Sequence, residues 1–292
     1  MVALLRTGRH PWVEYAARVE DRGSTMAVLE DELRDLAEPS GQTTLLSENA
    51  FDPQKLIADA RAELERWAAR GMRLVTVLDP DYPPNLRAVH DRPPILFIAG
   101  RLTDKDARGV AVVGARKATA AGTERAAAIA EHLVDTFYTV ISGLAAGIDT
   151  AAHTAALAKR GRTVAVIGTG LTRAYPPQNE SLQRRIAQNA AVISQFWPDS
   201  PPTRRSFPMR NAVMSGIALA TVVVEASDTS GARMQARLAL AQGRPVFLLK
   251  TLVEQQPWAR DCAAGAGTHV VTKPAEITTA LERLTASDPL VA

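Results

Sequence analysis

The sequence contains a single cysteine, Cys262, and few aromatic residues, which make up 5% of the chain. One thiol excludes an internal disulfide framework and any metal site built from several thiolates. No apolar segment is long enough to cross a membrane, and the apolar residues 1–5 are cut short by Arg6, Gly8 and Pro11. We therefore expect a cytoplasmic protein with no membrane anchor, in which residues 1–5 belong to a first helix.

The motifs of several enzyme classes are also absent. No glycine-rich segment ends in the Gly-Lys-Ser/Thr of a P-loop, and Ser142 lacks the flanking glycine of a hydrolase nucleophile elbow. The segment after Val113 is not a dinucleotide fingerprint, because Arg116 stands where the second glycine belongs. The five histidines are scattered, with no carboxylate cluster at ligand spacing. We expect no catalytic group, no metal and no other cofactor.

The charge is divided unevenly along the 292 residues. Residues 1–107 hold 14 Lys and Arg against 18 Asp and Glu, a net charge of −4, whereas residues 108–292 hold 20 against 13, a net charge of +7. A basic domain attracts phosphates and nucleic acid through its field, and such binding weakens as salt rises. A solvated, arginine-rich surface without any ligand has the same charge. Both interpretations remain open on charge alone.

Residues 1–70 have the pattern of a small helical N-terminal domain. Apolar residues recur at helical spacing on both sides of Gly23, which predicts two short helices. The segment 39–42 breaks this pattern, and a third helix is predicted to begin at Pro53, with Asp52 as its cap. Because this unit is acidic and has no catalytic group, we interpret it as a docking or orienting module.

Residues 71–285 alternate strands with helices, and residues 286–292 form a short tail. This alternation predicts a mostly parallel sheet covered by helices on both faces, an extended Rossmann-like α/β fold. Strands are expected near residues 73–78, 94–98, 110–113, 138–141, 163–167, 191–194, 221–225 and 245–249. Helices are expected near residues 121–136, 149–160, 178–188, 210–219 and 231–242.

Three of the predicted strands end on glycine just before a helix. They lead into Gly114, into Ser142 and Gly143, and into Gly168 and Gly170. Glycine lets the backbone approach a phosphate closely, and the start of the following helix offers unpaired N–H groups. Ligands of parallel sheets bind at the carboxyl ends of the strands, where these turns lie. The turns therefore predict a site for phosphates or for a phosphodiester backbone.

A series of short motifs covers residues 72–280 in a fixed order. They are Tyr82-Pro83-Pro84, residues 113–116, 142–153, 168–171, 175–179, 207–211 and 222–226, and Ser230-Gly231. In sequence and spacing they resemble the DNA-processing protein A family, known as DprA or Smf, within a superfamily of Rossmann-like nucleotide-binding proteins. Each motif alone is short, but their order and spacing make the resemblance specific.

The resemblance implies a single-stranded DNA-binding protein that helps to load RecA recombinase in natural transformation or recombination. It also implies a homodimer, which we expect to form through the C-terminal part of the sheet domain. The arginines of two family motifs correspond to Arg116 and Arg210, and we expect both to keep their charge in solvent or on DNA phosphates. The other residues expected to bind DNA or phosphate are Gly114, Lys117, Ser142, Gly143, Gly168, Gly170 and Asn211.

The sequence departs from the family pattern at several positions. Ala115 replaces the serine of one arginine motif, Ala212 replaces an arginine of the other, and residues 248–251 replace a Pro-Gly loop. The sequence does not continue into the winged-helix domain that many members append. These departures keep a second interpretation open, a nucleotide-binding sensor of the same superfamily, for example one acting in phage defence.

Seven residues are candidates for orienting a nucleotide, and each also suits a structural role. Asp149 and His153 lie one helical turn apart, as an acid–base pair would, but Asp149 also suits a helix N-cap and His153 a half-buried, hydrogen-bonded position. Glu225 suits a ribose contact or a clamp on the N–H groups of residues 230–233, and Tyr175 suits a stacked base or a packed turn. The full set is Asp149, His153, Tyr175, Asn179, Glu225, Ser230 and Gly231.

Overall fold

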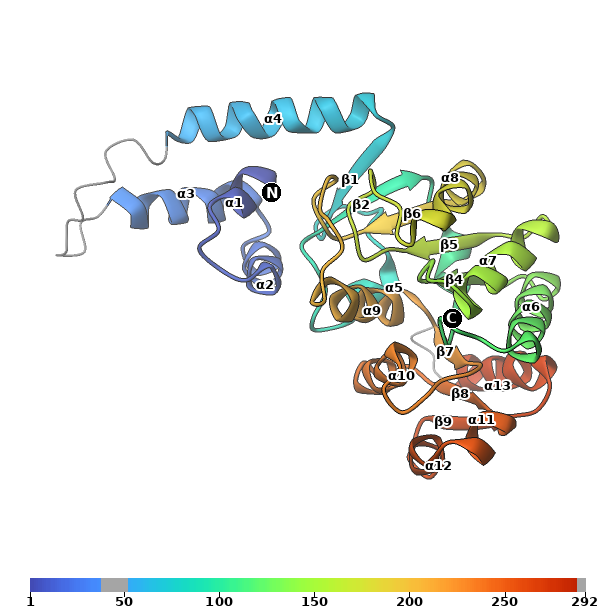
Figure 1. The fold of residues 1–292 in the computed structure, drawn as a ribbon. Helices are drawn as coiled ribbons and strands as arrows, with labels where there is room; N and C mark the ends of the chain where they lie inside the picture. Colours follow the sequence, from blue (N-terminus) through green and yellow to red (C-terminus); the bar gives the residue numbers. More distant parts are fainter. Residues whose placement is uncertain (38–51, 288–292) are drawn as a thin grey trace.

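One sheet of nine strands forms the centre of the structure, a computed structural model that describes residues 1–37 and 52–287 (Figure 1). The strand order is β1-β2-β6-β5-β4-β3-β7-β8-β9. The seven strands from β6 to β9 in this order pair in parallel, whereas β2 pairs antiparallel with both β1 and β6. The strands are β1 (Met72–Thr76), β2 (Ile95–Gly100), β3 (Gly109–Val113), β4 (Thr139–Ser142), β5 (Thr163–Val166), β6 (Ala191–Ser194), β7 (Ala220–Val223), β8 (Val246–Leu249) and β9 (Thr268–Val271).

Helices cover both faces of this sheet, which explains why the central strands are runs of Val, Ile and Ala. Every residue of β3 to β8 is buried, as expected for parallel strands that have no solvent face. On one face α6 (Ala120–Asp135), α7 (Ile148–Ala158) and α8 (Glu180–Asn189) pack side by side, with α13 (Pro274–Ser287) against α6. On the other face lie α9 (Ser206–Ile217) and α10 (Gly231–Ala241), with the short α5 (Pro84–Arg87) against α9.

Two further short helices, α11 (Lys250–Gln255) and α12 (Pro257–Ala263), lie between β8 and β9. Single turns of 3-10 helix span Asp104–Arg108 and Pro177–Asn179. Among the helices of the described residues, none combines the length and the apolar character needed to span a bilayer.

The N-terminal region is helical, as predicted. It consists of α1 (Val2–Arg6), α2 (Trp12–Arg22), α3 (Thr25–Ala37) and α4 (Pro53–Ala69). Asp52 caps α4 by accepting a hydrogen bond from the Gln54 N–H at 2.9 Å, which confirms the predicted start of this helix. Residues 2–5 lie in a first helix, the short α1, as predicted. Gly8, with φ of 66°, and Pro11 separate α1 from α2, and the predicted break at residues 39–42 lies outside the described residues.

The predicted fold class is confirmed, and the predicted strands and helices are present with shifted ends. Four elements of the C-terminal region were not predicted: the strand β9 and the helices α11, α12 and α13. The segment that begins at Lys250 is helical, where the sequence suggested a remodelled loop. The division into units of residues 1–70 and 71–285 stays a prediction, because one hydrophobic core contains residues from both.

A buried ion pair fixes the turn that leads into β3. The Asp106 carboxylate accepts hydrogen bonds from Arg162 Nε at 2.6 Å and from the Thr103 N–H at 2.8 Å, and it is 5% exposed. Thr139 Oγ1 lies 3.2 Å from the same carboxylate. The pair therefore joins the starts of β3, β4 and β5 at one edge of the sheet.

We expect Asp106→Ala to lower the free energy of unfolding by about 3 kcal/mol, because it leaves the Arg162 guanidinium without its partner. Urea unfolding followed by circular dichroism measures the change. Asp104→Ala, at an exposed position of the same turn, is the control and should change the stability by less than about 0.5 kcal/mol. Equal effects of the two substitutions would contradict this assignment.

Candidate functional site

The chain changes direction between β3 and β7, and this point defines the site. From β3 the strands continue through β4, β5 and β6 on one side, whereas from β7 they continue through β8 and β9 on the other. Val112 of β3 pairs with Val222 of β7, so the loops that follow these two strands leave the sheet side by side. In open parallel sheets, the crevice at such a switch point is where ligands bind.

Two adjoining cavities form a groove along this edge of the sheet, which we call the strand-end groove. The larger, of about 450 Å³, lies over β3, β7 and the start of α10, and the smaller, of about 140 Å³, lies over β4 and β5. Arg116, Ala145, Phe207 and Arg210 line both cavities. The other predicted site residues that line the groove are Gly114, Lys117, Gly143, Asp149, Gly168, Tyr175, Asn211, Ser230 and Gly231.

Arg116 and Lys117 are the open cations of the groove. Both are exposed, and within residues 1–37 and 52–287 neither has a hydrogen-bond or ion-pair partner. The Arg116 guanidinium lies over the ring of Phe207, with its carbon 5.0 Å from the ring centroid, and the ring of Tyr175 lies 5.4 Å from that of Phe207. Tyr175 is 39% exposed. A cation, an aromatic stack and an open aromatic face therefore follow one another along the groove.

Arg210 is buried, although we expected its charge to lie in solvent or on DNA phosphates. It is 6% exposed, and its guanidinium donates to the Val166 carbonyl oxygen at 3.0 Å. Burial lowers the pKa of Arg210, the nearby Asp149 carboxylate raises it, and Arg116 lowers it further. A Cβ atom at Gly143 would overlap the guanidinium, so glycine at this position makes room for the arginine. The Arg210 Nε atom is buried without a hydrogen-bond partner among the described residues.

Asp149 holds the turn after β4, but it is not the N-cap of α7. That cap is Gly147, and the Asp149 carboxylate turns back to accept hydrogen bonds from the N–H groups of Gly143 at 3.1 Å and Ala145 at 3.3 Å. Burial raises the pKa of Asp149, which Arg210 and these N–H groups oppose. The Gly143 N–H therefore already has an acceptor within the protein.

Five predicted site residues face other parts of the molecule and do not line the groove. Ser142 Oγ donates to the Val112 carbonyl oxygen at 2.7 Å, inside the sheet. Gly170 donates its N–H to the Ser200 carbonyl oxygen at 2.9 Å. Asn179 Nδ2 donates to the Leu144 carbonyl oxygen at 2.9 Å.

The other two are Glu225 and His153. Glu225 clamps the start of α6 and not residues 230–233, because its carboxylate accepts from the N–H of Thr119 at 2.9 Å and from its hydroxyl at 2.7 Å. His153 is fully buried, not half-buried, and its Nδ1 lies 2.7 Å from Thr163 Oγ1. Both residues serve the fold of the domain.

The loop of residues 224–230, which leads from β7 to α10 beside the groove, is held at its end by Ser230 and by Asn211 of α9. Ser230 caps α10 by accepting from the Ala232 N–H at 3.0 Å, and Asn211 Nδ2 lies 3.3 Å from the Gly231 carbonyl oxygen. Sequence reasoning missed Phe207 as a site residue, although it precedes Arg210 by three positions and shares its helical face. Among the residues that the structure describes, no three His, Cys, Asp or Glu side chains converge to hold a metal ion.

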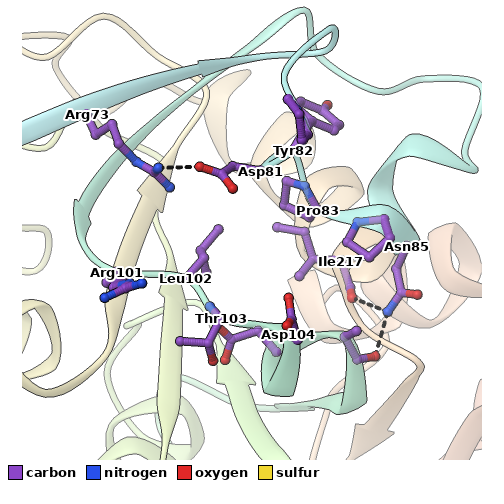
Figure 2. A pocket seen from close by; sticks show the side chains of 14 residues that line it. Arg73, Asp81, Tyr82, Pro83, Asn85, Arg101, Leu102, Thr103, Asp104 and Ile217 are labelled. Carbon is purple, nitrogen blue, oxygen red and sulfur yellow. Dashed lines mark hydrogen bonds and ion pairs between the residues drawn. The ribbon is translucent and has the colours of Figure 1, made fainter.

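A separate cavity of about 370 Å³ opens at the opposite edge of the sheet (Figure 2). Arg73 and Asp81 form an ion pair there at 2.6 Å. Leu102 and Ile217 point into the cavity from opposite sides, and Pro83 lies next to Ile217. None of the site residues predicted from the sequence lines this cavity. Arg73 is already paired there, but the exposed Arg101 also lines this cavity and has no side-chain hydrogen bond or ion pair among the described residues, so the strand-end groove differs from it by the open aromatic surface beside its cations.

Fold and groove together define a Rossmann-like α/β protein with a groove at the switch point of a mostly parallel sheet. The chain belongs to the DNA recombination-mediator protein A family, whose model matches residues 73–287. Protein Smf of Synechocystis sp. is 40% identical over 190 residues, which are 64% of this chain and 48% of that protein. DNA processing protein DprA of Streptococcus pneumoniae is 38% identical over 174 residues, 60% of this chain and 61% of that protein. The match thus covers about half to three fifths of the length of these relatives.

Two solved structures share the fold. DprA from Streptococcus pneumoniae superimposes with a TM-score of 0.66 at 30% identity, over 79% of this chain and 83% of that one. DNA processing protein A from Helicobacter pylori, studied for its single-stranded DNA binding mode, superimposes with a TM-score of 0.64, over 73% of this chain and 96% of that one. At 23% identity, the second comparison shows the shared fold alone.

His153 gives the domain a defined acid sensitivity. Burial lowers the pKa of His153 from 6.5 to about 3, so its proton binds more tightly to the unfolded chain. We expect this part of the stability to be present above pH 6.5 and to be lost as the pH falls toward 3, by up to about 1.4 kcal/mol per pH unit. His153→Gln should flatten the decline, as measured by urea unfolding across this pH range.

The matched control is His90→Gln, at an exposed position. It should keep the decline of the parent protein. If His153→Gln and the parent show the same pH dependence, His153 is not the group responsible.

Proposed function

We propose that the strand-end groove binds single-stranded DNA without marked sequence preference. The observation that carries this proposal is the row formed by Arg116, Phe207 and Tyr175, in which an open cation and open aromatic surface lie next to each other. Proteins that bind single strands combine cations that follow the phosphates with aromatic faces on which any base can stack. The net charge of +7 on residues 108–292 favours the same ligand.

Side chains, more than backbone N–H groups, would hold the phosphates. The Gly143 N–H is occupied by Asp149 and the Gly170 N–H by Ser200. Arg116 and Lys117 are free to contact phosphates. Arg210 is buried in the wall of the groove and contributes to its positive field. Tyr175 offers a face for one base. Glu225 and Asn179 act indirectly by fixing the loops that carry these groups.

The family name, recombination mediator, and the single-stranded DNA binding mode of the Helicobacter pylori protein favour a role in recombination. We extend the proposal to assistance of RecA loading on single-stranded DNA, in natural transformation or another recombination pathway, by a cytoplasmic protein that is not an enzyme. A nucleotide sensor is the second candidate. It is favoured by the volume of the larger cavity, about 450 Å³, which suits one nucleotide.

Arg116→Ala should weaken binding of a labelled oligothymidylate by about 1–3 kcal/mol, because a charge-assisted contact to a phosphate is lost. The slope of log K against log salt should fall by about 0.7, since one fewer counterion is released. Fluorescence anisotropy across a salt series measures both quantities. Thermal unfolding should match the parent, because the exposed Arg116 has no ion-pair partner among the described residues.

Arg61→Ala on α4 is the control, since it removes an exposed arginine outside the groove. It should leave affinity and slope unchanged. Absence of oligonucleotide binding at low salt would overturn the proposal. Tighter binding of a mononucleotide than of the oligonucleotide would establish the sensor instead.

We also propose that the chain self-associates through the C-terminal part of its sheet. Among the described strands, β9 pairs with β8 alone, and its Val270 is 46% exposed. An open edge with an exposed apolar side chain is a template for pairing with a second chain. Light scattering at a protein concentration on the order of tens of micromolar, where a weak dimer is populated, should give the mass of a dimer. A strict monomer for the parent would contradict this proposal, and Val270→Lys should shift a dimer to monomer.

A further inference from the structure

The loop of residues 197–205, between β6 and α9, contacts the N-terminal helices through a cluster of aromatic rings. The Trp197 ring centroid lies 5.2 Å from that of Trp12 on α2 and 5.9 Å from that of Trp67 on α4. Phe97 of β2 completes the cluster at 5.9 Å from Trp197. The Arg6 guanidinium carbon lies 4.0 Å from the Trp197 centroid. The side chain at position 197 is therefore held by α1, α2 and α4 at once.

The middle of the same loop holds the turn after β5. The Gly170 N–H donates to the Ser200 carbonyl oxygen at 2.9 Å. The Thr172 N–H donates to the Pro198 carbonyl oxygen at 3.0 Å, and the Thr172 hydroxyl lies 2.8 Å from the same oxygen and 2.7 Å from the Asp199 carboxylate. A Cβ atom at Gly170 would overlap the carbonyl oxygens of Trp197 and Pro198, so loop and turn are in direct backbone contact. Gly168, two residues earlier in this turn, lines the strand-end groove.

The end of the loop sets the start of α9. The Ser206 N–H donates to Thr203 Oγ1 at 3.0 Å, and the Thr203 N–H donates to Ser206 Oγ at 3.1 Å, a reciprocal pair that fixes the first turn. Phe207 and Arg210 follow in the first turns of α9, and both line the groove. One loop thus joins the N-terminal helices to two walls of the groove.

We propose that Trp12, Trp67 and Arg6 are positioning residues for DNA binding, which act through the 197–205 loop and touch no DNA themselves. The inference rests on the proposed function of the groove. A loop without regular structure loses conformational freedom when a ligand orders it, and this loss weakens binding. Fixing Trp197 before binding removes that loss, so the N-terminal helices raise the affinity of a groove to which they do not belong.

Trp12→Ala tests this inference by anisotropy with a labelled oligothymidylate of about 16 nucleotides. We expect the Kd to rise roughly three- to tenfold, the range that corresponds to loss of an aromatic pair. The slope of log K against log salt should stay unchanged, because no phosphate contact is lost. Trp12→Phe keeps an aromatic ring and should restore most of the affinity. Val13→Ala, at the exposed neighbouring position, should bind like the parent.

A second pair of variants tests the loop from its other side, without altering the N-terminal helices. Thr172→Val removes the hydroxyl that contacts Pro198 and Asp199, and we expect it to raise the Kd about threefold. Thr172→Ser keeps the hydroxyl and should bind like the parent. If Trp12→Ala does not fold, this pair decides alone.

The possible failures are distinguishable. If the parent protein does not bind the oligonucleotide, the proposed function of the groove falls. If the parent binds and both Trp12→Ala and Thr172→Val bind equally well, the inference is overturned while the function stands. A lower binding-competent fraction with an unchanged Kd, measured by titration at high protein concentration, would show that Trp12 serves folding only and would also overturn it.

Discussion

The parallel pairing of β3 with β7 is the constraint on which the rest of the site depends. These strands are neighbours in the sheet but are separated by four α-helices and three strands in the sequence. The hydrogen-bonded ladder continues beyond them, since the Ala115 N–H donates to the Glu225 carbonyl oxygen at 2.6 Å. A Cβ atom at Gly114 would collide with Ile148 and with the same carbonyl group. Glycine at position 114 therefore serves this close approach, which brings the two loops together at the switch point.

The buried charge of Arg210 explains why the groove differs from a simple anion-binding loop. A guanidinium out of water needs compensating groups, and it receives the Val166 carbonyl oxygen and the field of Asp149. Asp149 in turn occupies the N–H groups of Gly143 and Ala145. The N–H groups of Gly143 and Ala145 in the turn after β4 are thus already hydrogen-bonded within the protein, and Gly143 makes room for the Arg210 guanidinium. Recognition of phosphate then depends on the open cations of the rim.

Much of the fold could be predicted from the sequence because parallel strands buried on both faces leave a strong signal. The runs at residues 110–113, 140–141 and 164–167 are apolar, and glycine follows each of them within two residues. The signal fails at β9, which is partly exposed and contains Thr268 and His269 among its four residues. It also fails at α11 and α12, which are too short for a helical period to stand out.

The candidate site was less predictable, for a different reason. The sequence placed Arg116, Lys117 and the glycine turns at the correct edge of the sheet. It gave no information on whether a side chain at that edge points into the groove or into the protein, as Ser142 and Arg210 show. The direction of Arg210 follows from how α9 crosses the turns after β4 and β5, where its guanidinium meets Gly143 and Val166. Such a crossing is a tertiary relation, and local periodicity carries no trace of it.

The N-terminal helices contact the 197–205 loop through aromatic rings, and this bears on how binding can be measured. The N-terminal helices are acidic and the sheet domain is basic, yet Trp12, Trp67 and Trp197 form the contact that holds the 197–205 loop. Burial of apolar surface is not screened by salt at moderate ionic strength, whereas contacts between exposed charges are. Raising salt should therefore weaken phosphate contacts in the groove and the exposed Arg70–Asp199 ion pair of the loop, while the ring contact stays in place. A loss of affinity that is independent of salt then points to the ring contact.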